Sequence, residues 1–259
     1  MALQYSRLFQ LRAGIQLIGD EGPLSKNELA EMLRQRKDFN VGDEDSTEGA
    51  EDIIGGLRRA NLVVDSGDGY RLTDESDLQE LVGDQTLLYT GQSAYGAGDK
   101  RAQAARILAN IMYEHPMLIQ LSKYVFKRGP VKSYEAKKEF DGTDYLGDVM
   151  NSFTIDMGIN LLSDAGVIED TANGYTGSRW PVRLFAHVVY EEFSDLIDKE
   201  TESVRESELF ERIQTVYGID RAAFDRLLSQ LHSEGIVSES SYEELILNSD
   251  ALTNTNIHE

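Results

Sequence analysis

One short pattern recurs three times along the chain and limits the folds that it can adopt. It consists of an aliphatic residue, three further residues, a glutamate and an apolar residue, and the copies span 24–29, 131–136 and 204–209. A glutamate in the first turn of a helix favours the positive end of the helix dipole. Ser25 and Ser203 are residue types that cap helices. Each copy therefore predicts the start of a helix.

A second pattern follows each of these glutamates after 23 to 29 residues. It is a leucine, three residues, a glycine or asparagine, and two aliphatic residues, and it spans 57–63, 162–168 and 231–237. Glycine and asparagine adopt the left-handed conformation that ends a helix, and β-branched residues suit a strand. The second pattern predicts a helix, a sharp stop and a strand.

Amphipathic helices and hairpins complete the three repeats. Apolar residues at helical spacing predict a helix before each first pattern, over 8–18, 118–126 and 185–197. Turn residues between short apolar runs predict a hairpin after each second pattern, over 63–72, over 167–175 with a turn at Asn173-Gly174, and near 238–247. The sequence thus predicts three helices and a hairpin, three times over.

This order of elements resembles the winged helix-turn-helix superfamily in each repeat. The segments 56–63 and 69–73 are similar to the third helix and wing of many archaeal and bacterial regulators. The resemblance implies a mainly α fold with short β-hairpins (α+β), built from three tandem winged-helix domains joined by helical linkers. We expect domain 1 over 1–75, a helical linker over 76–115, domain 2 over 116–183, and domain 3 over 184–259 with a flexible C-terminal tail.

The charge of the chain bears on its partners. The sequence contains 46 acidic and 25 basic residues, a formal net charge of -21, and the acids are spread along the whole chain. This surface resembles that of proteins from salt-in halophilic archaea. In molar salt the Debye length is about 3 Å, so local basic patches, and not the net charge, decide the contacts. The acidity therefore does not exclude a nucleic-acid partner.

Several classes of site have no support in the sequence. The chain has no cysteine, which excludes disulfides and cysteine-based metal sites. None of His115, His187, His232 and His258 has the spacing of a metal ligand, and His187 fits a core or boundary position. No phosphate-loop, dinucleotide or hydrolase motif occurs. We expect no enzyme activity, cofactor or small-molecule ligand, although a nuclease built from scattered acids stays open.

Neither an export leader nor a run of 18 apolar residues is present. We therefore expect a cytoplasmic protein without a membrane partner.

The basic residues gather in the first two repeats, where they have two interpretations. They can contact DNA phosphates, or they can be ordinary surface charges paired with neighbouring acids. The candidate DNA-binding residues are Arg34, Arg36, Arg58, Arg59, Arg71, Lys123, Lys127, Arg128, Lys132, Lys137 and Lys138.

The third helices argue against strong base-specific readout by all three repeats. Acids lie in or around them: Glu51 and Asp52, then Asp144, Asp148 and Asp156, then Asp225. Trp180, the only tryptophan, is either a plug between the second and third repeats or an exposed anchor that binds a partner.

Two functions remain open. The first is a DNA-associated regulator, for example of transcription, or an accessory factor that binds double-stranded DNA through domains 1 and 2, with domain 3 mediating assembly. The second is a scaffold subunit of a chromosome-organising or defence-type complex, whose winged helices bind a partner protein or a second copy of the chain.

Overall fold

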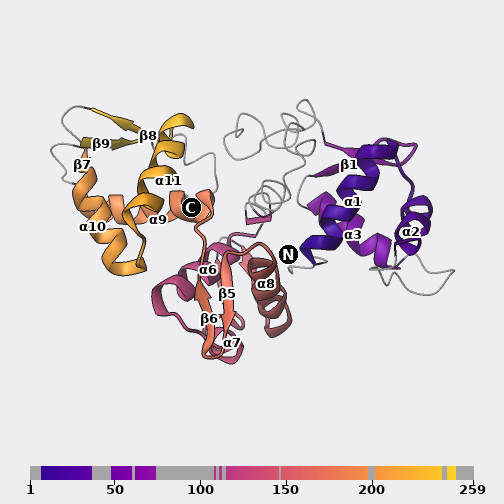
Figure 1. Ribbon diagram of the computed structural model, residues 1–259, viewed down its shortest axis with the longest axis horizontal. Coiled ribbons are helices and arrows are strands. Elements are labelled where there is room, and N and C mark those ends of the chain that lie inside the picture. Colours follow the sequence, from indigo (N-terminus) through magenta and orange to yellow (C-terminus); the bar gives the residue numbers. More distant parts are fainter. Residues whose placement is uncertain are drawn as a thin grey trace.

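The computed structural model describes residues 7–36, 48–59, 62–73, 108, 111–112, 115–145, 147–197, 202–240 and 244–248. This part of the chain is mainly helical, with small antiparallel sheets (Figure 1). Most of the expected linker 76–115 and the expected tail after residue 248 lie outside the described residues. Within the described residues, no helix is long and apolar enough to cross a membrane.

The elements fall into three groups, which we call units one, two and three. Unit one (7–73) contains α1 (Leu8–Glu21), α2 (Lys26–Arg34), α3 (Glu48–Arg59), β1 (Val63–Asp65) and β2 (Tyr70–Leu72). Unit two (115–180) contains α6 (Met117–Arg128), α7 (Ser133–Phe140), β3 (Asp144–Tyr145), β4 (Asp148–Val149), α8 (Ser152–Asp164), β5 (Ile168–Thr171) and β6 (Gly174–Gly177). Unit three (181–248) contains α9 (Val182–Leu196), β7 (Val204–Arg205), α10 (Glu206–Tyr217), α11 (Arg221–Ser233), β8 (Val237–Glu239) and β9 (Glu244–Leu247).

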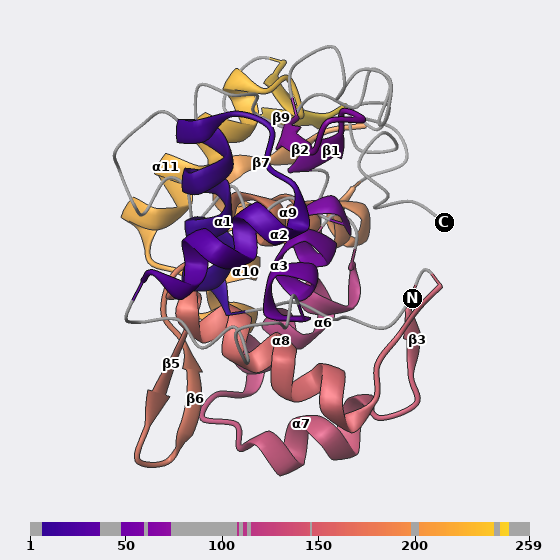
Figure 2. The same cartoon turned by 90° about the vertical axis from the view of Figure 1, so that its right-hand side faces the viewer.

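The first residue of the first sequence pattern joins the hairpin of its own unit. Leu24 and Tyr70 exchange two backbone hydrogen bonds of 3.0 and 2.8 Å, and Val131 and Tyr175 exchange two of 2.8 Å. In unit three the same pairing widens into a short strand, in which Val204 lies opposite Leu245. Each hairpin is thus held against the start of its unit's second helix, and in Figure 2 the β5–β6 hairpin stands beside α7 and α8.

In units one and two the recurring glutamate caps the helix that it begins. The Glu28 carboxylate accepts a hydrogen bond of 2.8 Å from the Ser25 N–H, and the Glu135 carboxylate accepts one of 2.7 Å from the Lys132 N–H. Both glutamates occupy the third helical position, where such a bond satisfies a backbone donor that the helix leaves free. This glutamate therefore has a structural role.

The second sequence pattern forms the same helix end three times. The N–H five residues after the leucine donates to the leucine carbonyl, at 2.8 Å for Leu62 to Leu57, 2.9 Å for Val167 to Leu162 and 3.0 Å for Ile236 to Leu231. Gly166 and Gly235 supply the left-handed residue just before it, with φ of 68° and 71°. These bonds are those of a Schellman cap, which turns the chain sharply into the first hairpin strand.

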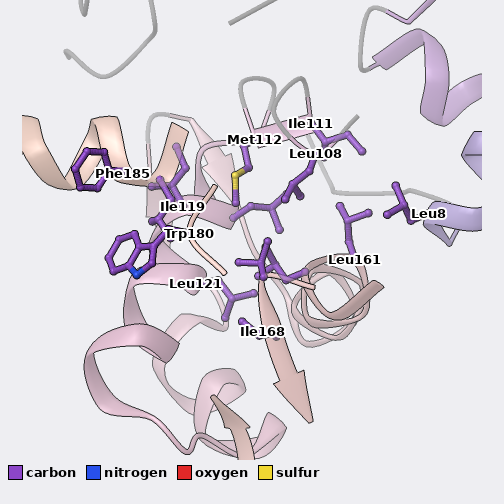
Figure 3. Close-up of a cluster of buried hydrophobic side chains, with 14 of the residues drawn as sticks. Leu8, Leu108, Ile111, Met112, Ile119, Leu121, Leu161, Ile168, Trp180 and Phe185 are labelled. Atoms are coloured by element: carbon purple, nitrogen blue, oxygen red, sulfur yellow. The ribbon is translucent and has the colours of Figure 1, made fainter. Parts of the chain in front are cut away.

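A buried apolar cluster runs through the units and across their junctions. In Figure 3, Leu8 at the start of α1 lies near Leu161 of α8, with Leu108, Ile111 and Met112 beside them. An ion pair between Arg7 and Asp164 lies at this junction of units one and two. The side chain of Trp180 lies at the opposite side of unit two, toward Phe185 of unit three (Figure 3).

Candidate nucleic-acid interface

Four of the cations expected to contact DNA lie exposed on unit two. Lys127 and Arg128 end α6, Lys132 precedes α7, and Lys138 lies in the last turn of α7. The Arg128 guanidinium lies over the Tyr124 ring, 5.3 Å from its centroid. Within the described residues none of the four has a carboxylate partner. Their charges are therefore available to an external anion.

Two other cations of unit two are paired inside the molecule. Lys123 is only 13% exposed and forms an ion pair with Glu191 of α9. The Lys137 Nζ lies 2.5 Å from the Asp156 carboxylate of α8, which also accepts a hydrogen bond of 2.7 Å from the Ser133 hydroxyl. The charges of Lys123 and Lys137 are thus compensated by helices α9 and α8.

Unit one presents fewer available cations. The Arg58 side chain is exposed, and its guanidinium lies over the Tyr70 ring of the hairpin, 5.9 Å from its centroid. Arg34 forms an ion pair of 3.0 Å with Glu31, and Arg71 donates a hydrogen bond of 3.2 Å to the Leu72 carbonyl. The side chains of Arg36 and Arg59 are half-buried. Among the candidate residues of unit one, Arg58 is therefore the one best placed to meet an external anion.

The third helices of units one and two offer little to base edges. Helix α8 contains no lysine or arginine, and its Asp156 is engaged by Lys137 and Ser133. In α3, Glu51 pairs with Lys26, and Asp52 is exposed. Asp148 is buried, and its carboxylate lies 3.3 Å from His115 Nδ1. This arrangement suits contacts with phosphates better than sequence readout.

A groove of about 650 Å³ lies between units two and three. It brings Lys127 and Arg128 together with Arg179, just after β6, and with Arg226 of α11. Arg179 and Arg226 were not among the residues predicted to bind DNA, because neither lies within the basic clusters of the first two repeats. Only their positions could have indicated a role: Arg179 follows a predicted hairpin, and Arg226 lies in a predicted third helix.

Trp180 fills the junction beside this groove. It is 8% exposed, and its ring lies 4.5 Å from Phe126 of α6, 5.9 Å from Tyr217 of α10 and 6.3 Å from Phe185 of α9, between ring centroids. The indole therefore packs as a plug between units two and three and does not present an anchor to a partner.

A buried ionic network joins α6 to α9 on another side of the same junction. The Glu191 carboxylate lies 3.0 Å from His187 Nε2 and also pairs with Lys123. Burial opposes the ionisation of Glu191, but hydrogen bonds from His187 and Lys123 outweigh it and lower the pKa of Glu191 to about 2. His187 is 2% exposed, and burial lowers its pKa in spite of the Glu191 carboxylate. This histidine is a core residue held by its neighbours.

Glu191→Gln is expected to lower the free energy of unfolding at pH 7 by about 1–2 kcal/mol, after discounting for partial solvent screening. A carboxylate whose pKa is depressed on folding stabilises the fold above its unfolded pKa, and this contribution is lost as the pH falls through the folded pKa. The difference between wild type and variant should therefore shrink between pH 5 and pH 2 in urea titrations followed by circular dichroism.

Glu139→Gln is the matched control for this experiment. Glu139 is exposed and has no ion-pair partner among the described residues, so this substitution should change stability by less than about 0.5 kcal/mol. A pH-independent effect of Glu191→Gln would contradict the assigned role of the network.

Among the described residues, no group of three or more histidine, aspartate or glutamate side chains is arranged to hold a metal ion. His115 and Asp148 instead bond to each other, and Asp148 also accepts a hydrogen bond of 3.3 Å from the Met117 N–H at the start of α6. The pair thereby ties the β3–β4 hairpin to α6.

Two features thus bear on function: the exposed cations of units one and two that have no carboxylate partner among the described residues, and the groove between units two and three. Comparisons of the chain with protein-family models, curated proteins and solved structures find no match.

Proposed function

We propose that this protein is a non-enzymatic DNA-associated regulator or accessory factor, built from three tandem winged-helix domains, that binds the phosphate backbone of double-stranded DNA. The observation that carries the proposal is the set of exposed cations without a carboxylate partner among the described residues of units one and two: Arg58, Lys127, Arg128, Lys132 and Lys138. Although the chain has 46 acids against 25 bases, these five cations keep their charge for an external anion such as a DNA phosphate.

The winged-helix assignment is supported by the threefold recurrence of the same local structure. Each unit has the same helix end before its hairpin, and each hairpin pairs with the residues that begin the second helix. In such a domain the wing and the ends of neighbouring helices can reach the DNA backbone. Arg58 lies over the hairpin residue Tyr70, and Lys132 follows Val131, which pairs with the β5–β6 hairpin.

Backbone contacts without base readout fit the acidic third helices. A protein that contacts only phosphates binds duplexes of different sequence with similar affinity. The dispersed carboxylates keep the protein hydrated in concentrated salt, and at molar KCl the Debye length of about 3 Å screens their repulsion from DNA. We therefore propose a protein of a high-salt cytoplasm.

The triple variant Arg58→Gln, Lys127→Gln, Lys132→Gln is expected to weaken binding to a labelled duplex at least about tenfold, measured by fluorescence anisotropy in 0.2–2 M KCl. Each lost phosphate contact should also change the slope of log K against log [KCl] by about 0.9. The slope of the variant should therefore be less negative than that of the wild type by nearly three.

A second triple variant, Lys26→Gln, Arg212→Gln, Arg221→Gln, provides the charge-matched control. These three cations are paired with Glu51, with Glu192, and with Glu206 and Asp225, respectively. Both triple variants lose the same formal charge, so an equal effect would mean that affinity follows net charge and not these sites. No binding by the wild type, or cleavage of the duplex in Mg²⁺, would refute the proposed function.

The rival proposal, a protein-binding scaffold, is favoured by one specific observation. Tyr134 of α7 and Phe153 of α8 are each 64% exposed, and Val149 of β4 is 45% exposed. Exposed aromatic residues are common at protein interfaces. A stoichiometric protein that co-purifies with the wild type but not with Tyr134→Ser, Phe153→Ser, in the absence of nucleic acid, would favour the scaffold.

A further inference from the structure

The groove between units two and three has walls from both units. The last turn of α6 and the residues after β6 supply one wall, and the turn from α10 into α11 supplies the other. Among the described residues of its lining, four have cationic side chains, Lys127, Arg128, Arg179 and Arg226, and one, Asp220, has a carboxylate. In a chain of net charge -21, this excess of positive charge is local and opposite to that of the molecule.

The cations of this groove can interact with an external anion. All four cations are exposed, and none has a carboxylate partner among the described residues. Asp220 is already engaged, because its carboxylate caps α11 by accepting a hydrogen bond of 2.8 Å from the Ala223 N–H. An anion that enters the groove therefore meets cations that no carboxylate of the described residues neutralises.

The groove differs from a pocket for a small ligand. Its interior is formed by buried apolar side chains, including Val125, Trp180 and Ile219, whereas its charges lie at exposed positions. No described residue of its lining has a buried polar side-chain atom without a partner. Specific small-molecule sites usually contain a few such polar groups directed at the ligand. The groove therefore fits a polymer with regularly spaced negative charges, which would contact the exposed cations at its edge.

Its aromatic residues also distinguish between kinds of nucleic acid. Sites for single strands stack unpaired bases on exposed aromatic rings, but Trp180 and Tyr217 are only 8% and 6% exposed. Phe126, which also lines the groove, is half-buried and packs against Trp180, with 4.5 Å between ring centroids. The described lining therefore offers charge without an exposed aromatic ring, which fits the phosphates of a duplex.

We propose that the groove between units two and three binds consecutive phosphates of double-stranded DNA, with Arg179 and Arg226 as contact residues. This inference rests on the proposed function and deepens it, because it gives unit three, otherwise expected to mediate assembly, a direct part in DNA binding. The Trp180 plug holds the two walls together and so fixes the spacing of the cations.

The test uses the double variant Arg179→Gln, Arg226→Gln and two readouts. Anisotropy of a labelled duplex should show at least about tenfold weaker binding, and a slope of log K against log [KCl] that is less negative by about 1.8, at about 0.9 for each lost contact. Trp180 is the only tryptophan and lines the groove. Its emission should therefore change when unlabelled duplex is added to wild type, with the same midpoint as the anisotropy, and not when it is added to the variant at the same concentrations.

Arg221→Gln is the matched control, because Arg221 lies on the same helix as Arg226 but pairs with Glu206 and Asp225. It should bind the duplex within about twofold of wild type, since it removes no phosphate contact. Thermal melting of each variant checks that the fold is retained.

The outcomes separate this inference from the proposed function. If the Arg58, Lys127, Lys132 variant loses binding while the Arg179, Arg226 variant binds like wild type with an unchanged tryptophan response, the groove inference fails and the proposed function stands. If tripolyphosphate changes Trp180 emission but the groove variant binds duplex normally, the groove takes a small phosphate ligand and the inference is also overturned. If wild type binds no duplex, both fail.

Discussion

Trp180→Ala is expected to lower the free energy of unfolding by about 3–5 kcal/mol, the usual cost of removing a buried aromatic side chain. The indole contacts rings from α6, α9 and α10. Behind it the ring contacts continue from Phe185 to Phe224 and on to Phe210. The substitution thus opens a cavity where unit two meets unit three, and urea titration followed by circular dichroism measures the loss.

Two further variants test whether the loss comes from the plug. Phe153→Ala removes an aromatic side chain that is 64% exposed and should cost less than about 0.5 kcal/mol. Trp180→Phe keeps a ring in the junction, so it should lower the free energy of unfolding less than Trp180→Ala does. If Trp180→Ala costs no more than Phe153→Ala, the indole does not join the units.

The helices and hairpins were largely predictable because their signals are local. The helix expected over 8–18 is α1 (Leu8–Glu21), that over 118–126 is α6 (Met117–Arg128), and that over 185–197 is α9 (Val182–Leu196). The hairpin expected over 63–72 is formed by β1 and β2. Helical periodicity and turn residues act within a few positions of the chain, so sequence alone carries this information.

The small β3–β4 hairpin and the strand β7 were not predicted. β3 and β4 have two residues each, too few for an alternating pattern to stand out. β7 forms only because β9, about 40 residues later, pairs with it at Val204 and Leu245. Pairing over such distances depends on tertiary structure, which the local pattern does not contain.

The candidate site was predictable only in part, for a similar reason. Lys123 and Lys127 are separated by one helical turn, yet Lys123 pairs with Glu191, 68 positions away, and Lys127 lines the groove. Clustering of cations in the sequence could not distinguish a paired lysine from an available one. Arg179 and Arg226 were not predicted as site residues, because they come together only where units two and three meet.

Gly69→Ala is expected to cost about 3 kcal/mol or more, because backbone strain and overpacking each cost about 1–3 kcal/mol. Gly69 has φ of +153°, and a Cβ there would lie 2.7 Å from the Leu24 carbonyl carbon. The Leu24 backbone cannot move aside without breaking its two hydrogen bonds to Tyr70. Circular dichroism in urea measures the stability, and hydrogen–deuterium exchange of peptides covering 62–73 locates the change.

Gly67→Ala measures the cost of a positive φ alone, without the close contact between a new Cβ and Leu24. Gly67 has φ of +85° in the same turn, but a Cβ there would meet nothing within 4 Å, so only strain of about 1–2 kcal/mol is expected. Gly174 of unit two repeats the geometry of Gly69, with a Cβ 2.8 Å from the Val131 carbonyl oxygen. Equal effects at Gly67 and Gly69 would show that the hairpin is not held against Leu24, and would remove the structural equivalence of units one and two on which the winged-helix proposal depends.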